Sequence, residues 1–260
     1  MKKLLFLIGA LFAAGCSEQS QDLLGDDVKL FASTKAWLLA QAVSRDDTTE
    51  IYLILSKNHE LINAREPKFG QTLLSWAIYT NHYSAAKALL QHGANPNIRD
   101  LHKGITPLIN AADKYETSAY VKLLIDYKAN PNLAATDSTE SHATPLISAA
   151  YNRLESVKLL IDAGATVNYE APYHKSALYA AFTRDRVDIV RYLIIEQGAD
   201  IKRPITYRST YDGKEGAPVM VTDLLRNWVF PLDSENYKEK MAIVSYLKLK
   251  GEYRKTDIPE

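Results

Sequence analysis

The one cysteine and the six histidines are the side chains of this sequence best suited to nucleophilic or metal chemistry. Histidines at His-x-x-x-His or His-Glu-x-x-His spacing would indicate a zinc site, and a Gly-x-Ser-x-Gly turn would indicate a serine nucleophile. Neither pattern occurs in the sequence, and no glycine-rich phosphate loop follows a strand-like segment. The histidines are scattered along the chain, at His59, His82, His92, His102, His142 and His174. We therefore predict a protein that is not an enzyme and that uses no metal ion and no cofactor.

Cys16 is the residue whose surroundings predict a covalent modification. It follows Lys2, Lys3 and an apolar run over residues 4–14, a pattern typical of a secretory signal and too short for a permanent membrane span. The sequence Ala13-Ala14-Gly15-Cys16 resembles the bacterial lipoprotein box, in which the cysteine is acylated and becomes the first residue of the mature chain. A plain signal peptide with an incidental cysteine is the alternative.

The lipoprotein resemblance implies that residues 1–15 are removed and that several acyl chains on Cys16 hold the protein at a membrane. Each buried methylene group contributes about 0.8 kcal/mol to such attachment. Ser17, rather than an aspartate, is similar to the sorting signal of outer-membrane lipoproteins. Residues 16–33 are interpreted as the lipidated cysteine and a flexible tether, because the segment that follows the cysteine is polar. We expect a protein of the periplasm that touches the outer membrane only through its lipid anchor.

The rest of the chain contains two nearly identical segments, TPLINAA over residues 106–112 and TPLISAA over residues 144–150. Each is followed by the run VKLLID, over residues 121–126 and 157–162, and then by a small turn sequence. Two apolar helices and a turn that recur about every 30–40 residues are typical of a solenoid. These residues resemble the ankyrin repeat, whose pattern includes Thr-Pro-Leu, then Val-x-x-Leu-Leu, then Gly-Ala-Asp.

The ankyrin resemblance implies an all-α fold of helix-turn-helix units. About four clear repeats are expected, and they open at Thr72, Thr106, Thr144 and Ser176. Degenerate N- and C-terminal units are interpreted as capping repeats, because the end units of a solenoid must present a polar outer face. Residues 34–254 are predicted to form this array, and residues 255–260 a C-terminal tail.

Local signals predict where the helices begin. Thr72, Thr106 and Thr144 can cap the free N–H groups of a first helix. Pro107 and Pro145 suit the first helical turn, where proline costs no hydrogen bond.

Other local signals concern the ends of the second helices. Gly93, Gly164 and Gly198 suit a left-handed residue after each helix. Lys128 replaces this glycine in one unit, where we expect strain or a modified turn. The ankyrin family has a histidine after Thr-Pro-Leu that ties neighbouring repeats together, and this histidine is missing here. The residues in its place are Ser75, Ile109, Ile147 and Tyr179. The resemblance therefore leaves open how stiffly neighbouring repeats are joined.

In ankyrin proteins the partner usually contacts the tips of the finger-like loops between repeats and the inner face of the first helices. The resemblance therefore implies these partner-binding residues: Phe69, Gln71, Tyr79, Thr80, His102, Lys103, Ile105, Asp113, Lys114, Tyr115, His142, Tyr151, Asn152, Tyr173, His174 and Arg184. Tyr79, Tyr115 and Tyr151 would form an aromatic stripe, which favours a protein epitope because Tyr and Arg dominate interface energetics. The alternative is that these tyrosines pack between neighbouring first helices.

The connection over residues 202–220 is longer than most connections in compact domains. Its Tyr207, Arg208 and Tyr211 are added to the predicted binding residues, since long connections are usually functional or disordered. A mobile loop without a role is the alternative.

The chain carries 31 basic and 31 acidic residues. Without a basic excess there is little to hold a phosphate backbone, so nucleic-acid binding is disfavoured. Our leading hypothesis is a monomeric, lipid-anchored periplasmic protein that binds another protein. In its sharpest form it is an inhibitor, or immunity protein, that neutralises a toxin or lipase acting on the envelope. A structural adaptor for an envelope protein complex is the alternative, and an enzyme hidden in the degenerate ends is disfavoured.

Overall fold

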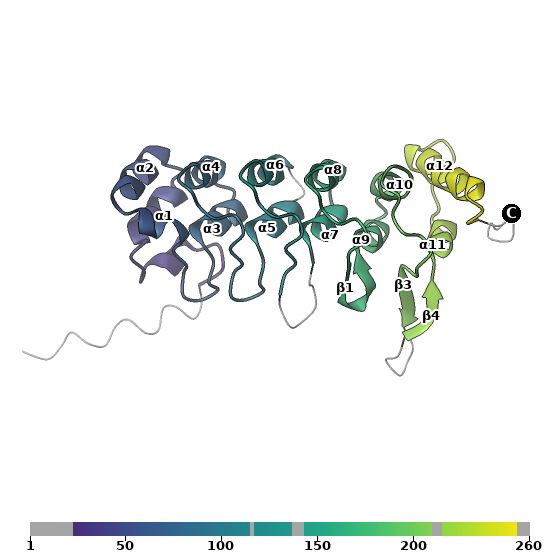
Figure 1. The fold of residues 1–260 in the computed structure, drawn as a ribbon, viewed down its shortest axis with the longest axis horizontal. Coiled ribbons are helices and arrows are strands. Elements are labelled where there is room, and N and C mark those ends of the chain that lie inside the picture. Colours follow the sequence, from purple (N-terminus) through teal and green to yellow (C-terminus); the bar gives the residue numbers. More distant parts are fainter. Residues whose placement is uncertain (1–22, 115–116, 137–142, 210–214, 254–260) are drawn as a thin grey trace, which may run out of the picture.

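In the computed structural model, which describes residues 23–114, 117–136, 143–209 and 215–253, the helices form two parallel rows. Figure 1 shows the even-numbered helices in one row, the odd-numbered helices in the other, and loops and hairpins projecting from the odd-numbered row. Consecutive helices pair as neighbours in space, and each pair stacks on the next. The result is an elongated array in which every unit contacts mainly the units beside it.

Four helix pairs make up the central part of the array. They are α3 (Leu73–Tyr79) with α4 (Tyr83–Gln91), α5 (Pro107–Asp113) with α6 (Ala119–Asp126), α7 (Pro145–Ala150) with α8 (Leu154–Asp162), and α9 (Ala177–Thr183) with α10 (Val187–Arg191). Before them lie α1 (Trp37–Ser44), α2 (Thr48–Lys57) and the short η2 (His59–Asn63), and after them lie α11 (Val221–Asn227) and α12 (Glu235–Leu249). This architecture confirms the predicted solenoid of four repeats between irregular end units.

Two short antiparallel hairpins accompany the helices. The first joins β1 (Glu170–Ala171) to β2 (Lys175–Ser176) through the helical turn η3 (Pro172–His174). The second pairs β3 (Thr206–Ser209) with β4 (Glu215–Val219), with Thr206 opposite Val219. The long connection between the fourth and last units therefore contains a paired hairpin in its described part.

The helix-start signals are confirmed by the cap geometry. The hydroxyl groups of Thr72, Thr106 and Thr144 each accept a hydrogen bond from the backbone N–H three residues later, at 3.2–3.3 Å. Pro107 and Pro145 occupy the first turn of α5 and α7. All three threonines are buried, so these bonds satisfy donors that water does not reach.

The helix-end signals are confirmed as well. Gly93, Gly164 and Gly198 have positive φ angles of 88°, 90° and 63°. Lys128 adopts the same left-handed conformation at φ 65°, as expected for a strained substitute for glycine.

The second helix of the fourth repeat contains one residue more than its equivalent in the third. Eight steps separate Val190 from Gly198, whereas seven separate Val157 from Gly164. The helix absorbs this residue in η4 (Tyr192–Glu196), a π-helical segment that directly continues α10. An added residue of this kind is a usual origin of π-helical turns.

Part of the segment before residue 34 packs on the first helix of the array. The 3₁₀ turn η1 (Val28–Phe31) places Leu30 and Phe31 in the core, with 4% and 0% of their surface exposed. The prediction of a flexible tether is therefore wrong for this part of residues 16–33. Burial of these two apolar side chains against α1 offsets the loss of chain freedom.

Small residues let the first helices pack closely. Ala77, Ala112, Ala150 and Ala181 occupy the C-terminal half of α3, α5, α7 and α9, and each is 0% exposed. Leucines and β-branched residues from both helices of each pair fill the space around them in one continuous core. Alanine also has the highest helix propensity, so packing and local preference agree.

A row of asparagine side chains joins the second-helix ends of neighbouring repeats. Each accepts a hydrogen bond from a backbone N–H of the following repeat, at 2.7–2.9 Å. The pairs are Asn63 with Asn95, Asn97 with Asn130, Asn132 with Thr166, and Asn168 with Asp200. Asn97 and Asn132 also donate to the carbonyls of Lys128 and Gly164. We call this row the asparagine ladder.

Polar contacts also join repeats at the opposite ends of the second helices. Asp46 accepts from the backbone N–H of Ala85 at 2.6 Å, and Asn81 accepts from the Tyr120 hydroxyl at 3.1 Å. Burial, followed by the charge of Asp46, raises the pKa of Tyr120 to about 12. In the place of the missing family histidine, Ser75 accepts a hydrogen bond from Asn110 at 3.2 Å. The stiffness that the absent histidines would supply therefore has other sources here.

Asn132→Ala is expected to lower the free energy of unfolding by about 1–2 kcal/mol, because it removes two hydrogen bonds between repeats. Urea unfolding followed by circular dichroism would measure this loss. Asn236→Ala is the control, since Asn236 is exposed near the start of α12 and lies outside the ladder. Equal stability of Asn132→Ala and the parent protein would contradict the role of the ladder.

Candidate interaction surface

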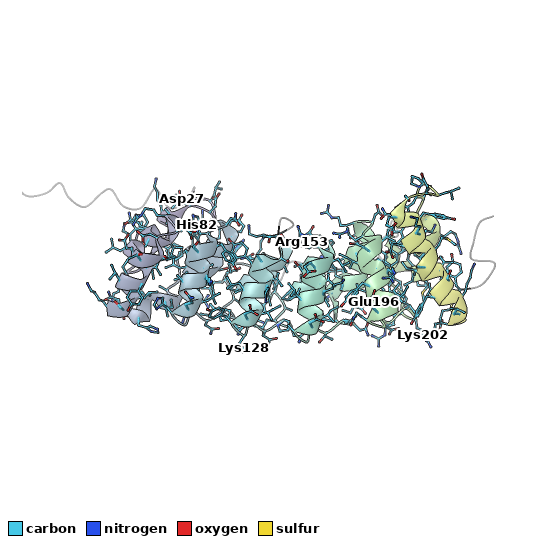
Figure 2. The ribbon with its side chains drawn as sticks, turned by 90° about the horizontal axis from the view of Figure 1, so that it is seen from above. Asp27, His82, Lys128, Arg153, Glu196 and Lys202 are labelled. Atoms are coloured by element: carbon cyan, nitrogen blue, oxygen red, sulfur yellow. The ribbon has the colours of Figure 1, made fainter. Side chains whose placement is uncertain are left out.

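Two sets of residues form the candidate surface. One consists of the described loop and hairpin residues that project from the odd-numbered row in Figure 1, here called fingers and numbered by the unit that each precedes: finger 1 (residues 65–72), finger 2 (99–106), finger 4 (170–176) and finger 5 (206–209 with 215–219). The other is the line of C-terminal ends of α3, α5, α7 and α9. Figure 2 shows His82 and Arg153, which follow two of these ends, along one long edge of the array, and Lys128 and Lys202 along the other.

Finger 1 is folded around the buried carboxylate of Glu66, which is 1% exposed. This carboxylate accepts backbone hydrogen bonds from Lys68, Phe69 and Gln71 at 2.7–2.9 Å. Hydrogen bonds to a charged acceptor are among the stronger ones, so the loop is held in one shape. Phe69 is half-buried against the core, and Gln71 is half-buried with its Oε1 unpaired.

Finger 2 repeats this design around Asp100. Its carboxylate accepts from the backbone N–H groups of His102, Lys103, Gly104 and Ile105, at 2.7–3.2 Å. The side chains of His102 and Lys103 are exposed at the tip, and Ile105 is half-buried. Sequence reasoning did not identify the two organising carboxylates. The available signal was an acidic residue four positions before Gly70 and before Gly104.

Neighbouring fingers are bonded side by side. The Leu101 N–H donates to the Phe69 carbonyl at 2.8 Å, and the Arg65 guanidinium donates to the Arg99 carbonyl at 2.7 Å. The rings of Phe69 and His102 meet edge to face, with centroids 5.6 Å apart. These contacts make fingers 1 and 2 one rigid unit.

At the end of α3, Tyr79 and Thr80 have different roles. Tyr79 is 52% exposed, and so is available to a partner. The Thr80 hydroxyl donates to the Trp76 carbonyl at 2.7 Å and lies 2.7 Å from His82 Nδ1. His82 also stacks on Trp76, with ring centroids 5.3 Å apart, so Thr80 and His82 hold the turn together.

The corresponding ends of α5 and α7 are joined to each other. The Asn152 side chain donates to the Asp113 carbonyl at 3.0 Å. Asp113 itself is exposed, and Lys114 is partly exposed. Tyr151 is half-buried and packs against the core, and this burial raises the pKa of its hydroxyl. Of the predicted aromatic stripe, the Tyr79 side chain is therefore exposed, whereas part of the Tyr151 side chain is buried against the core.

The remaining predicted residues lie around α9 and the two hairpins. Tyr173 is 74% exposed, Arg184 and Arg208 are exposed, and Tyr207 is half-buried. His174 contacts Glu170 and Glu215 with its two ring nitrogens, and these contacts raise its pKa. Four predicted residues lie outside the part of the chain that the structure describes: Cys16, Tyr115, His142 and Tyr211.

The turn between α11 and α12 extends the same edge and was not predicted. Trp228 donates its indole N–H to Asp185 at 2.6 Å and packs on Phe182, with ring centroids 4.8 Å apart. This anchor leaves Val229 and Leu232 at 89% and 77% exposed. This turn follows α11 as the turn at Thr80 follows α3. The sequence of the last unit departs from the repeat pattern, so the equivalence could not be recognised from the sequence.

The described residues include exposed side chains suited to binding, and no set of side chains suited to holding a metal ion is found among them. Among them, no three histidine, cysteine or acidic side chains gather into a site for a metal ion. In the same ranges, no helix is long and apolar enough to cross a membrane. Exposed aromatic, cationic and apolar side chains on a rigid frame are the groups that recognise another protein.

Comparison with known families agrees with this architecture. The ankyrin-repeat model matches residues 69–101, and a model of three ankyrin repeats matches residues 99–171 and 136–205. Together these matches cover more than half of the chain.

Similar proteins occur in viruses and in animals. A putative ankyrin repeat protein of fowlpox virus, FPV031, is 31% identical over 127 residues, which are 48% of this chain and 37% of the viral protein. The nuclear factor NF-kappa-B p105 subunit of Gallus gallus is 31% identical over 156 residues, which are 60% of this chain and 15% of that protein. The putative ankyrin repeat protein L371 of Acanthamoeba polyphaga mimivirus is 29% identical over 153 residues, which are 59% of this chain and 19% of the viral protein. The chain thus spans well under half of the length of these relatives.

Gly104→Ala is expected to destabilise the protein more than Gly164→Ala. Both glycines have positive φ, 64° and 90°, so both substitutions carry the backbone strain. A Cβ at Gly104 would also lie 2.6 Å from the backbone nitrogen of Thr136, whereas a Cβ at Gly164 would meet nothing within 4 Å. We expect Gly164→Ala to cost about 1 kcal/mol and Gly104→Ala about 2–4 kcal/mol in thermal or urea unfolding. Equal losses would show that finger 2 does not depend on this close approach.

Proposed function

The chain belongs to the ankyrin-repeat family, and on this premise we propose that it is a lipid-anchored protein of the bacterial periplasm that binds another protein. In its most specific form, the proposal is an inhibitor that neutralises a toxin or lipase acting on the envelope. The partner would lie against the fingers and the adjoining ends of the first helices.

The observation that carries this proposal is the exposure of Tyr79 and Arg184 at the ends of first helices and of Tyr173 on finger 4. Tyr and Arg are the residues most often found to dominate binding energy. Here they extend from helix ends and a finger that hydrogen bonds hold in place. A preformed surface loses little freedom on binding, and this favours tight association.

The anchoring part of the proposal rests on the sequence around Cys16. Attachment through acyl chains would place the array beside the membrane. A toxin that acts on the envelope would be met there, before it reaches its target. An inhibitor needs a surface ready for its partner, and the rigid fingers support this role.

A structural adaptor for an envelope complex would use the same surface. The two functions differ in the partner. An inhibitor binds a toxin or a lipase, whereas an adaptor binds a resident component of the envelope machinery. Identification of the partner therefore distinguishes them.

The first test is co-isolation from envelope extracts with residues 17–260 as bait, followed by affinity measurement with the purified partner. The double variant Tyr79→Ala/Arg184→Ala is expected to weaken binding at least about tenfold, because loss of hot-spot residues costs about 2 kcal/mol or more. Recovery of a toxin or lipase supports the inhibitor, and recovery of resident envelope components supports the adaptor.

The matched control is Tyr52→Ala/Lys87→Ala. Tyr52 is 56% exposed on α2, close to the 52% of Tyr79, and Lys87 is exposed on α4. Both lie in the row of helices away from the fingers. This control is expected to bind like the parent protein. If the control lost affinity and the Tyr79/Arg184 variant kept it, the partner would bind the other face.

Acylation of Cys16 can be tested separately by growing Gram-negative cells that produce the protein with an alkyne-labelled palmitate. The label is expected on the parent protein and on Ser17→Ala, and to be absent from Cys16→Ser. The parent protein should also sediment with membranes, whereas Cys16→Ser should not, because stable attachment requires the acyl chains. An unlabelled parent protein would contradict the lipid anchor.

A further inference from the structure

One histidine joins two fingers that lie far apart in the sequence. His174 Nδ1 is 2.6 Å from Glu170 Oε1 within finger 4, and its Nε2 is 2.8 Å from Glu215 Oε1 on β4 of finger 5. Figure 1 shows the two hairpins as neighbours below α9 and α11. We call Glu170, His174 and Glu215 the histidine clasp.

The two contacts together require a protonated ring. An ionised carboxylate can only accept hydrogen bonds, so each ring nitrogen must donate one. A neutral imidazole carries a single N–H, and it would turn a lone pair toward one of the two carboxylates. With the ring neutral, one contact is lost, and the two glutamates, no longer bridged by a cation, repel each other.

Among the described residues, the strands around the ring carry two other charged groups, Lys175 and Arg208. The charged groups on the packed elements are Glu170 on β1, Lys175 on β2, Arg208 on β3 and Glu215 on β4. In the described part of the chain, the ring forms ion pairs with the two glutamates, and these are the charges that raise the pKa of His174, Glu215 first. The ring also packs on Tyr207, with centroids 4.6 Å apart, so finger 5 contributes an apolar contact beside the ion pair.

The backbone at the clasp is strained. Tyr173 and His174 have φ angles of 60° and 58°, two consecutive left-handed residues that are not glycine. Such conformations persist when the surrounding contacts hold them. The clasp supplies such contacts, because Glu170 and Glu215 hold the two ring nitrogens of His174.

We propose that the histidine clasp is a pH-sensitive lock, which holds finger 5 against finger 4 in mildly acidic medium and releases it as the medium becomes alkaline. This inference concerns the fold of the chain and does not require a partner. Its effect on binding through Tyr173, Tyr207 and Arg208 rests on the proposed function.

The direction follows from proton linkage. The pKa of His174 in the clasped state is raised above its ordinary value of about 6.5. A group whose pKa is raised in one state stabilises that state fully below the ordinary pKa. That stabilisation is lost as the pH rises through the raised pKa. Finger 5 should therefore be most firmly held below about pH 6.5 and loosen above it.

The first measurement is a titration of the histidine rings of the full chain by NMR, with His174 assigned from His174→Gln. The His174 ring should titrate at a higher pH in the folded parent protein than in the urea-unfolded chain, because its contacts with Glu215 and Glu170 favour the protonated form. Glu215→Gln should lower the proton affinity of His174 by about threefold to tenfold, since tenfold corresponds to one pKa unit. Glu215 has a side chain that is 64% exposed, so this variant is expected to fold.

The second measurement is hydrogen exchange of the β3 and β4 amides, corrected for the pH dependence of intrinsic exchange. The Ile205 N–H, which donates to the Val219 carbonyl at 2.8 Å, reports the base of the hairpin. Protection should fall on the order of tenfold between about pH 5.5 and about pH 8.5 in the parent protein and in His102→Gln. In Glu215→Gln and His174→Gln it should be low and independent of pH.

Two results would overturn the proposal. One is a His174 that titrates at the same pH in the folded and in the unfolded chain. The other is a Glu215→Gln variant that is folded by circular dichroism and keeps the full pH response of the parent hairpin. If the parent protein showed the predicted pH response but bound no protein partner, the proposed function would be wrong and the histidine clasp would stand. The two proposals therefore fail separately.

Discussion

No repeat of this array can bury its apolar face alone, so the structure depends on how each repeat is held to the next. Apolar packing supplies most of the driving force, but it is non-directional and does not by itself fix the register between neighbours. The asparagine ladder provides that register. Asn63, Asn97, Asn132 and Asn168 each accept from the backbone of the following repeat, so the bond forms only when two repeats are correctly placed. At the other ends of the second helices, Asp46 accepts from the backbone N–H of Ala85, and Asn81 accepts from the side-chain hydroxyl of Tyr120.

The fingers keep a fixed shape partly because they are attached to these stacked repeats. They are too short to be stable as isolated hairpins, and in fingers 1 and 2 a carboxylate completes the turn, buried at Glu66 and partly buried at Asp100. Glu66 and Asp100 each gather several backbone N–H groups, which turns their charge inward and leaves the tips to His102 and Lys103. The frame thus separates two tasks. Side chains that face into the loop fix its shape, and side chains that face outward are available for recognition.

Local patterns predicted the local structure well. The caps at Thr72, Thr106 and Thr144 and the left-handed turns at Gly93 and Lys128 depend on a few neighbouring residues, so the sequence alone contains the necessary information. Features that depend on distant residues were not predicted. The partner of His174 is Glu215, 41 residues away, and the partner of Trp228 is Asp185, 43 residues away. The degree of exposure of Tyr79 and Tyr151 was also open, because equivalent positions in a repeat differ in what their neighbours leave uncovered.

The π-helical segment of the fourth repeat has a consequence for how such an array changes during evolution. Its additional residue is taken up within the second helix, and the ladder bond from Asp200 to Asn168 beyond it keeps a length of 2.9 Å. An insertion in this row of helices is therefore contained within one unit and is not passed to the units that follow. The coding sequence of a second helix can therefore gain one codon without displacing the next repeat.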